Sequence, residues 1–220
     1  MRVLNALFPS RCIACGKEGA SFCAPCRGRI PLSPCGGLDC DGVFSLWEYA
    51  HPHVRAAIVA LKYKNKRMIA ADIAESLHDA LFEQLAEKSL FSDPLSLALT
   101  PHVYVIIPIP LSEKRYKERG YNQSELLAKE LARKNQMSFI LETRVLYKIK
   151  DTETQVSVKD RAKRLQNIRG SFAVQNHEKI RGKTVIIIDD VITTGATISE
   201  ARAMLQKAGA RTVYGVTVAH

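Results

Sequence analysis

The chain has 220 residues, of which 46% are hydrophobic and 25% charged, and its formal net charge is +10. A globular chain of this size buries enough surface to fold without disulfide staples. No apolar run reaches the roughly 18 residues of a membrane span, and the first residues lack the features of a signal peptide. We therefore expect a cytoplasmic protein without membrane insertion.

The cysteines all lie near the start of the chain, where the first four form two C-x2-C pairs separated by seven residues. Such turns let two thiolates converge on one metal, and four thiolates complete a closed, structural zinc site. A disulfide framework fits poorly in a cytosolic chain, and a redox-active pair lacks the preceding strand of a βα unit. The sequence predicts a zinc-ribbon-like module over residues 1–42, with zinc held by Cys12, Cys15, Cys23 and Cys26.

Two further cysteines, Cys35 and Cys40, have four residues between them. They could replace one of the first pairs, form half of a second site, or stay free. About 40 residues bury little core, so metal binding would supply the folding energy of such a module.

The rest of the chain, residues 43–220, alternates between strand and helix patterns. We predict strands at 43–49, 103–107, 144–149, 171–174, 184–188 and 211–219, and helices at 53–63, 67–88, 122–135, 157–168 and 197–208. A loop is expected at 89–102 and a mobile polar loop at 151–158. Fully apolar runs such as 184–188 are typical of buried parallel strands. The order predicts an α/β fold with a mostly parallel sheet flanked by helices.

Positive charge is concentrated in the middle of the chain, where residues 111–182 contain 17 Lys and Arg against 9 Asp and Glu. A basic stretch of this kind can attract nucleic acid or small phosphates, although a solvated surface would look the same.

The segment V-I-I-I-D-D-V-I-T-T-G-A-T at 185–197 is the most informative part of the sequence. Its strand delivers two adjacent carboxylates, Asp189 and Asp190, to the carboxyl end of a sheet, where α/β proteins bind ligands. The next residues can surround a phosphate with N–H groups and lead into a helix N-terminus, which favours anions. These residues are Thr193, Thr194, Gly195, Ala196 and Thr197. A capped helix after a buried strand would explain the turn but not the paired acids.

This segment resembles the signature of the type I phosphoribosyltransferases. The resemblance implies that Asp189 and Asp190 contact the ribose hydroxyls of phosphoribosyl pyrophosphate (PRPP) or face Mg²⁺, and that residues 193–197 hold its 5′-phosphate. The expected fold is the type I phosphoribosyltransferase fold.

Other segments resemble the ComF family over nearly the whole chain. They are L-K-Y-K at 61–64, P-I-P-L at 108–111, R-G-Y-N-Q-S-E-L-L at 119–127, the paired cysteines, and Gln155, Arg161, Arg164, Asn167 and Phe172 in their order. Asn65 departs from the glycine expected there. The resemblance implies a protein of competence-type DNA uptake, related to the GntX group, with possible partners in the competence machinery.

The chemistry of phosphoribosyl transfer calls for cations beside the pyrophosphate, because negative charge develops on that leaving group. The candidates after residue 111 are Lys114, Arg115 and Arg119, while Gln155 and Arg161 could reach the ligand from a closing lid. The alternatives without a function are an exposed charged turn after residue 111 and a linker at 151–158. The candidate nucleic-acid contacts are Lys62, Tyr63, Lys64, Lys117 and Arg164.

Three functions remain open from the sequence. The first is a DNA-handling protein that binds PRPP with Mg²⁺ and holds single-stranded DNA on its basic surface. The second is an active phosphoribosyltransferase acting on an amine or a base, although Thr193 stands where purine-salvage relatives usually have an acid that handles a proton. The third is a regulatory module that uses the fold only as a sensor.

Overall fold

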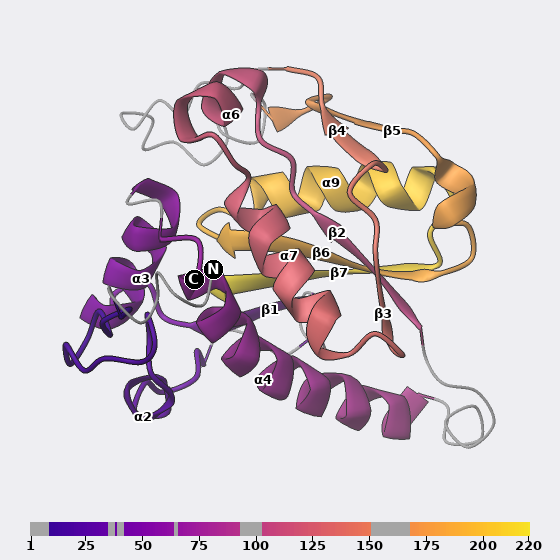
Figure 1. Cartoon of the computed structure of the whole chain (residues 1–220). Coiled ribbons are helices and arrows are strands. Elements are labelled where there is room, and N and C mark those ends of the chain that lie inside the picture. Colours follow the sequence, from indigo (N-terminus) through magenta and orange to yellow (C-terminus); the bar gives the residue numbers. More distant parts are fainter. Residues whose placement is uncertain (1–8, 35–37, 39–41, 64–65, 93–102, 151–167) are drawn as a thin grey trace.

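A computed structural model describes residues 9–34, 38, 42–63, 66–92, 103–150 and 168–220 (Figure 1). Its elements, in chain order, are α2 (Ala24–Arg27), β1 (Val43–Trp47), α3 (Pro52–Tyr63), α4 (Ile69–Ser92), β2 (Tyr104–Pro108), α6 (Glu113–Arg119), α7 (Gln123–Lys134), β3 (Phe139–Leu141), β4 (Leu146–Lys148), β5 (Phe172–Val174), the 3₁₀ turn η1 (His177–Lys179), β6 (Thr184–Val191), α9 (Ala196–Lys207) and β7 (Thr212–Ala219). No helix in these ranges is long and apolar enough to span a membrane.

The central sheet has five strands in the order β1-β7-β6-β2-β3, and every neighbouring pair is parallel. The strand β6 lies in the middle and pairs with β2 and β7 on its two sides. All carboxyl ends therefore meet at one edge of the sheet, where polar side chains that follow β6 can converge with those that follow β2. The predicted mostly parallel sheet is confirmed.

Alternating side chains of the strands divide the core into two layers. Ile106, Ile186 and Ile188 face a cluster that includes the buried sides of α3, α4 and α7, whereas Ile107 and Ile187 face α9 and the β4–β5 pair. Figure 1 shows α4 and α7 side by side across the first face and α9 on the other. This period of two is why the uninterrupted apolar run of β6 is buried on both faces.

The contact between α9 and the sheet depends on one glycine. A Cβ at Gly215 in β7 would lie 2.6 Å from Ile198 Cγ2, so any side chain there would push α9 away. Because α9 follows directly on the turn after the twin acids, this close packing fixes the height of that turn above the sheet.

Several predicted elements differ from the structure at their ends or in their pairing. The helix α4 continues to Ser92, into the residues predicted as a loop, and β6 extends through Asp189 and Asp190 to Val191. Helix α6 and strand β3 were not predicted. The strands β4 and β5 were predicted, but they pair with each other antiparallel, outside the main sheet. The predicted loop at 151–158 lies outside the described residues, as does the predicted helix at 157–168 except for its last residue.

The cysteine-rich segment is packed onto the first face of the sheet. Its Phe22 ring lies 5.9 Å from the ring of Trp47 in β1, and both side chains are buried. The backbone N–H of Phe22 donates to Asp72 of α4 at 2.8 Å. The segment and the sheet therefore share one hydrophobic core.

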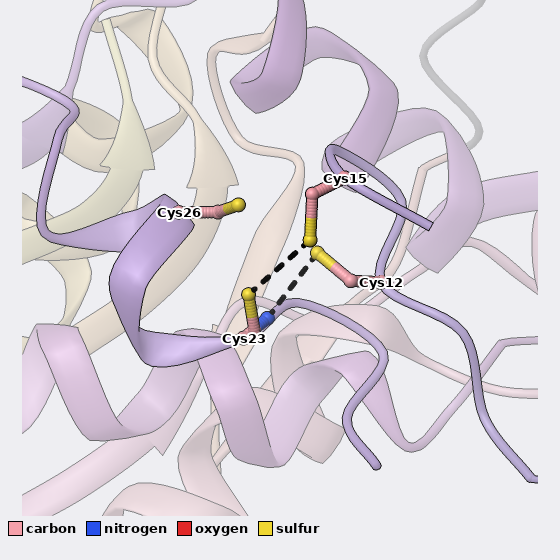
Figure 2. A group of neighbouring side chains, drawn as sticks. All are labelled: Cys12, Cys15, Cys23 and Cys26. Carbon is pink, nitrogen blue, oxygen red and sulfur yellow. Dashed lines mark hydrogen bonds between the residues drawn. The ribbon is translucent and has the colours of Figure 1, made fainter. Parts of the chain in front are cut away.

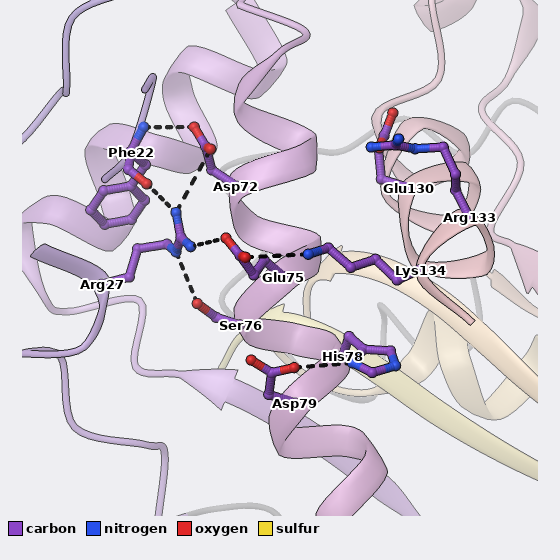
Figure 3. Close-up of polar contacts among 10 residues, drawn as sticks. All are labelled: Phe22, Arg27, Asp72, Glu75, Ser76, His78, Asp79, Glu130, Arg133 and Lys134. Carbon is purple, nitrogen blue, oxygen red and sulfur yellow. Dashed lines mark hydrogen bonds and ion pairs between the residues drawn. The ribbon is translucent and has the colours of Figure 1, made fainter. Parts of the chain in front are cut away.

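A buried arginine joins the same segment to α4 (Figure 3). The Arg27 guanidinium donates to the Phe22 carbonyl, to Ser76 Oγ at 3.0 Å and to Glu75, and it lies 3.7 Å from Asp72. Glu75 also accepts from Lys134 of α7, whose hydrogen bond lowers the pKa of Glu75. Burial raises the pKa of Asp72 despite the nearby Arg27 charge. Since a buried charge is tolerated only when it is paired, this network fixes where the segment sits.

Candidate functional site

Each of the twin acids at the end of β6 has its own protein partner. Asp189 Oδ1 accepts from Ser124 Oγ at 3.0 Å and from the backbone N–H of Asp190 at 2.9 Å. Asp190 Oδ1 lies 2.9 Å from Nζ of Lys62, at the end of α3. The Asp190 side chain is 6% exposed and that of Lys62 is 19% exposed. Two helices thus converge on adjacent carboxylates.

The position of Ser124 follows from the local sequence Tyr121-Asn122-Gln123-Ser124. Asn122 Oδ1 accepts from the Ser124 backbone N–H at 3.0 Å, which caps α7 at the predicted helix start. The amide of the same side chain donates to the Ile109 carbonyl at 2.9 Å, which ties the helix start to the end of β2. Ser124 is therefore buried with its hydroxyl directed at Asp189.

The pKa of Asp189 is raised from its ordinary value of 3.8 to about 7. Burial is the main cause and the neighbouring Asp190 charge is the second; the Asp190 N–H, Lys62 and Ser124 offset them in part. A second negative charge on the acid pair is therefore unfavourable even with Lys62 beside it, and Asp189 keeps a proton until the pH nears 7.

This shift predicts how stability depends on pH. Between about pH 4 and pH 7 the folded chain keeps a proton on Asp189 that the unfolded chain has released, so stability falls as pH rises through this window. Asp189→Asn cannot titrate and should lose this decline. Urea unfolding without Mg²⁺ measures the unfolding free energy of both proteins at pH 5 and at pH 8. The decrease from pH 5 to pH 8 should be larger in the wild type than in the variant by more than about 1 kcal/mol. Equal pH differences in both proteins would contradict the assignment.

The turn that follows the acids has the form of an anion cradle. Gly195 has a φ of +74°, a conformation that L side chains rarely adopt, and it immediately precedes α9. The Ala196 N–H lies 3.5 Å from Thr194 Oγ1, and Thr193 is exposed. The first N–H groups of a helix are not used within it, so this end of α9 can bind a phosphate. Of the predicted residues, 193–195 thus form a turn that leads from the acids into α9, and Ala196 and Thr197 are the first residues of that helix.

The acids also suit Mg²⁺ or sugar hydroxyls. Asp190 Oδ2 is buried and has no hydrogen-bond partner among the described residues. A buried acceptor without a donor is costly, and a ribose hydroxyl or a Mg²⁺-bound water would satisfy it. Carboxylate oxygens are also the ligands that Mg²⁺ prefers. The residues present therefore fit the expected ion.

A cavity of about 430 Å³ includes Lys62, the partner of Asp190, in its lining, and we call it the α6 cavity. It is lined by Lys62, Tyr63, Arg115, Glu118, Arg119 and Tyr121. Arg119 donates to Gln123 Oε1 at 2.8 Å, and its guanidinium lies over the Tyr63 ring at 5.2 Å. Three cations against one acid make this cavity suitable for an anionic group.

A second cavity of about 470 Å³, here the module cavity, lies between the cysteine-rich segment and the start of α4. Its lining residues are Ser10, Arg11, Ser21, Lys66, Arg67 and Met68. The Arg67 guanidinium lies 4.6 Å from the ring centroid of Tyr121, which also lines the α6 cavity. One cation–π contact therefore connects the two basic cavities.

Comparison with known proteins agrees with this site. The family described as phosphoribosyl transferase domain matches residues 118–220, which include α7, β6 and α9. Competence protein F of Haemophilus influenzae is 30% identical over 200 residues, covering 90% of this chain and 79% of that protein. This chain belongs to the ComF family. DNA utilization protein YhgH of Escherichia coli O157:H7 is 33% identical over 202 residues, which cover 92% of this chain and 80% of the relative. Competence protein ComFC of Bacillus subtilis is 36% identical over 135 residues, or 60% and 51% of the two chains.

The four cysteines predicted as ligands come together in this ComF-family chain (Figure 2). The Sγ atoms of Cys12, Cys15, Cys23 and Cys26 all lie within 4.8 Å of one another. Those of Cys15 and Cys23 are 3.7 Å apart, and Cys12 Sγ accepts from the Cys23 N–H at 3.5 Å. The cluster can hold a metal ion, and four thiolates are the donor set of structural zinc.

Two of these thiols have displaced pKa values. Burial opposes ionisation of Cys12, but N–H groups of Cys15, Cys23 and Ala14 outweigh it and lower the Cys12 pKa to about 6. Hydrogen bonding to Cys23 and then to Cys15 raises the pKa of Cys26 to about 12. Crowded thiols without a cation resist ionising together, so a metal is what would allow all four thiolates at neutral pH. Cys35 and Cys40 lie outside the described residues.

The other predicted site residues are distributed unevenly. Arg115 and Arg119 line the α6 cavity, whereas Lys114 and Lys117 are exposed on α6. Tyr63 is 69% exposed at the rim of the cavity. Lys62, expected as a nucleic-acid contact, lies instead against Asp190. Lys64, Gln155, Arg161 and Arg164 lie outside the described residues. Sequence reasoning assigned no role to Ser124, Gln123 or the module cavity.

Proposed function

We propose that this protein binds PRPP with Mg²⁺ at the end of β6. The observation that carries the proposal is the pair of acids, which a phosphate-type turn follows in the chain and whose partner Lys62 lines the basic α6 cavity. In this arrangement Asp189 and Asp190 take the ribose hydroxyls or face Mg²⁺, residues 193–197 take the 5′-phosphate, and the pyrophosphate extends toward Arg115 and Arg119. One ligand would then occupy the acids, the turn and the cavity together.

Catalysis is the second candidate function, and the completeness of this site favours it. Mg²⁺, when bound, would neutralise charge on the departing pyrophosphate. Arg119 is already held by Gln123 and Tyr63, so it needs little reorganisation to meet that charge. Thr193 cannot handle a proton near neutral pH, so any acceptor would need another base or would be an amine that is already neutral.

Calorimetry with PRPP and Mg²⁺ on the whole chain tests binding, and pyrophosphate release in a screen of amines and bases tests transfer. Saturable binding without turnover would favour the DNA-handling or sensor role, whereas turnover with any acceptor would establish a transferase. No binding by the intact protein would refute the proposed site.

We also propose that the protein holds single-stranded DNA during natural competence. The support is the net charge of +10, the two connected basic cavities, and relatives named competence protein F, competence protein ComFC and DNA utilization protein YhgH. Lys66 and Arg67 are exposed and line the module cavity, and the Tyr63 ring at the rim of the α6 cavity is also exposed, which suits phosphates and a stacked base. We assign Lys62 to the sugar-phosphate site and not to this surface.

The double variant Lys66→Met/Arg67→Met should weaken binding of a single-stranded oligonucleotide by about tenfold or more at low salt. Its slope of log affinity against log salt should also become shallower by about 1, because it releases fewer counterions. Fluorescence anisotropy at several salt concentrations measures both. Lys183→Met/Lys207→Met, which removes two exposed charges that line neither cavity, is the matched control. Equal binding and slope in the two variants would exclude the module cavity as the DNA surface.

For the cysteine cluster we propose zinc as the resident metal, in a structural role. Four thiolate ligands leave no open position for chemistry. The cluster lies next to Phe22 and Arg27, which join the segment to β1 and α4. The metal would therefore stabilise the wall of the module cavity.

A further inference from the structure

The feature that the proposed function does not explain is the ion pair between Lys62 and Asp190. It joins the last turn of α3 to the end of β6, with Nζ and Oδ1 separated by 2.9 Å. Asp190 needs a counter-charge when no ligand is bound, because its carboxylate is almost fully enclosed. Lys62 supplies that charge to one oxygen and leaves Oδ2 without a hydrogen-bond partner in the described part of the chain.

Lys62 belongs to two sites at once. Besides contacting Asp190, it lines the α6 cavity together with Arg115 and Arg119. The lysine stem is flexible and ends in a compact charge, so the ammonium can turn from the acid into the cavity without movement of α3. What decides its position is where negative charge is available.

We infer that Lys62 makes the site selective for sugar phosphates that carry a diphosphate next to the ribose. The inference rests on the proposed function. When ribose hydroxyls or Mg²⁺ engage Asp190, Lys62 loses its partner and is repelled by the incoming cation. A diphosphate in the α6 cavity gives Lys62 a new anion. A ligand without that group gives it none, so Lys62 stays on Asp190 and competes with the ligand.

This exchange has a signature that a merely structural lysine would not produce. Removing the ammonium takes a charged contact away from the diphosphate, but it also removes the competitor from Asp190. PRPP should therefore bind Lys62→Met about 10- to 100-fold more weakly than it binds the wild type, the usual effect of one lost charged hydrogen bond. Ribose 5-phosphate should bind the variant as tightly as the wild type or more tightly. The ratio of the two affinities is thus the diagnostic quantity.

Calorimetry on the whole chain, with Mg²⁺ and either PRPP or ribose 5-phosphate, measures that ratio. Lys62→Arg retains the charge and should keep most of the preference for PRPP. Lys183→Met removes the same charge just before the amino end of β6, at the opposite end of that strand from the acids, and should leave the ratio unchanged. Lys62→Gln, with a polar end, replaces the methionine variant if thermal unfolding shows that Lys62→Met does not fold.

The outcomes separate the two proposals. Wild-type protein that binds neither ligand overturns the proposed function and this inference with it. The inference alone is overturned if the wild type binds PRPP and loss of the ammonium lowers the affinities for both ligands equally. It is also overturned if loss of the ammonium changes neither affinity. Selective loss of PRPP affinity supports both.

Discussion

Replacing both twin acids with asparagine should weaken the binding of PRPP with Mg²⁺ by about 100-fold or more. Each charged hydrogen bond to a ligand contributes about 1.5–3 kcal/mol, and every 1.4 kcal/mol corresponds to tenfold in affinity. Asp189→Asn/Asp190→Asn keeps the shape of the side chains but removes both the charge that attracts Mg²⁺ and the strongest hydroxyl acceptors. Calorimetry against the wild-type protein measures the loss.

The control for this variant must separate binding from folding. The change at Asp190 would leave Lys62 without its counter-ion, so thermal unfolding of the double variant should be compared with the wild type before binding is measured. Asp79→Asn, which changes an acid that is 76% exposed on α4, is the control substitution and should bind PRPP normally. Unchanged affinity in a folded double variant would show that these acids do not contact the ligand.

Removing the proposed zinc from the cysteine cluster should destabilise the chain and change the fluorescence of its one tryptophan. Trp47 is 1% exposed and packs on Phe22, so unfolding of the cysteine-rich segment would bring the indole into water and shift its emission to the red. Small zinc modules gain about 10–16 kcal/mol from their metal. If loss of the metal lowered the unfolding free energy of the whole chain by about 4 kcal/mol, the Tm would fall by roughly 10 °C.

A chelator titration followed by emission and thermal unfolding tests this expectation, with excess Mg²⁺ restored so that only the cysteine site is emptied. Cys15→Ser/Cys26→Ser should give the same shift without a chelator, because it removes one ligand from each pair. Adding zinc should reverse the effect in the wild type and not in the variant. A chelated protein with unchanged emission and Tm would mean that the segment folds without metal.

Much of the fold could be predicted because the sequence patterns are strong and local. The apolar run before Asp189 is typical of a strand buried on both faces, and the helix predicted from residue 122 begins at its Asn122 cap. The short strand β3 has only three residues and no pattern of its own; it exists because it pairs with β2. Helix α6 is densely charged and buries none of its residues, so it lacks the periodic apolar face by which helices are recognised.

The site was predictable where one segment carries it and unpredictable where distant segments meet. Asp189, Asp190 and the turn to Thr197 are contiguous, and the two halves of the cysteine cluster are close in sequence. Lys62 has the pattern of an exposed cation at the end of an amphipathic helix, and only the tertiary structure places it against Asp190. The Asn122 cap held a usable signal for Ser124, because it fixes where α7 begins and Ser124 is the second residue of that helix.

The phenol of Tyr121 joins the two helices that hold the acids. Its hydroxyl donates to the carbonyl of Leu61, the residue before Lys62, and its own backbone leads into the turn that presents Ser124. This bond holds the end of α3 and the start of α7 at a fixed separation, so Lys62 can leave Asp190 while its helix stays in place. The two carboxylates would therefore keep their spacing when a ligand arrives.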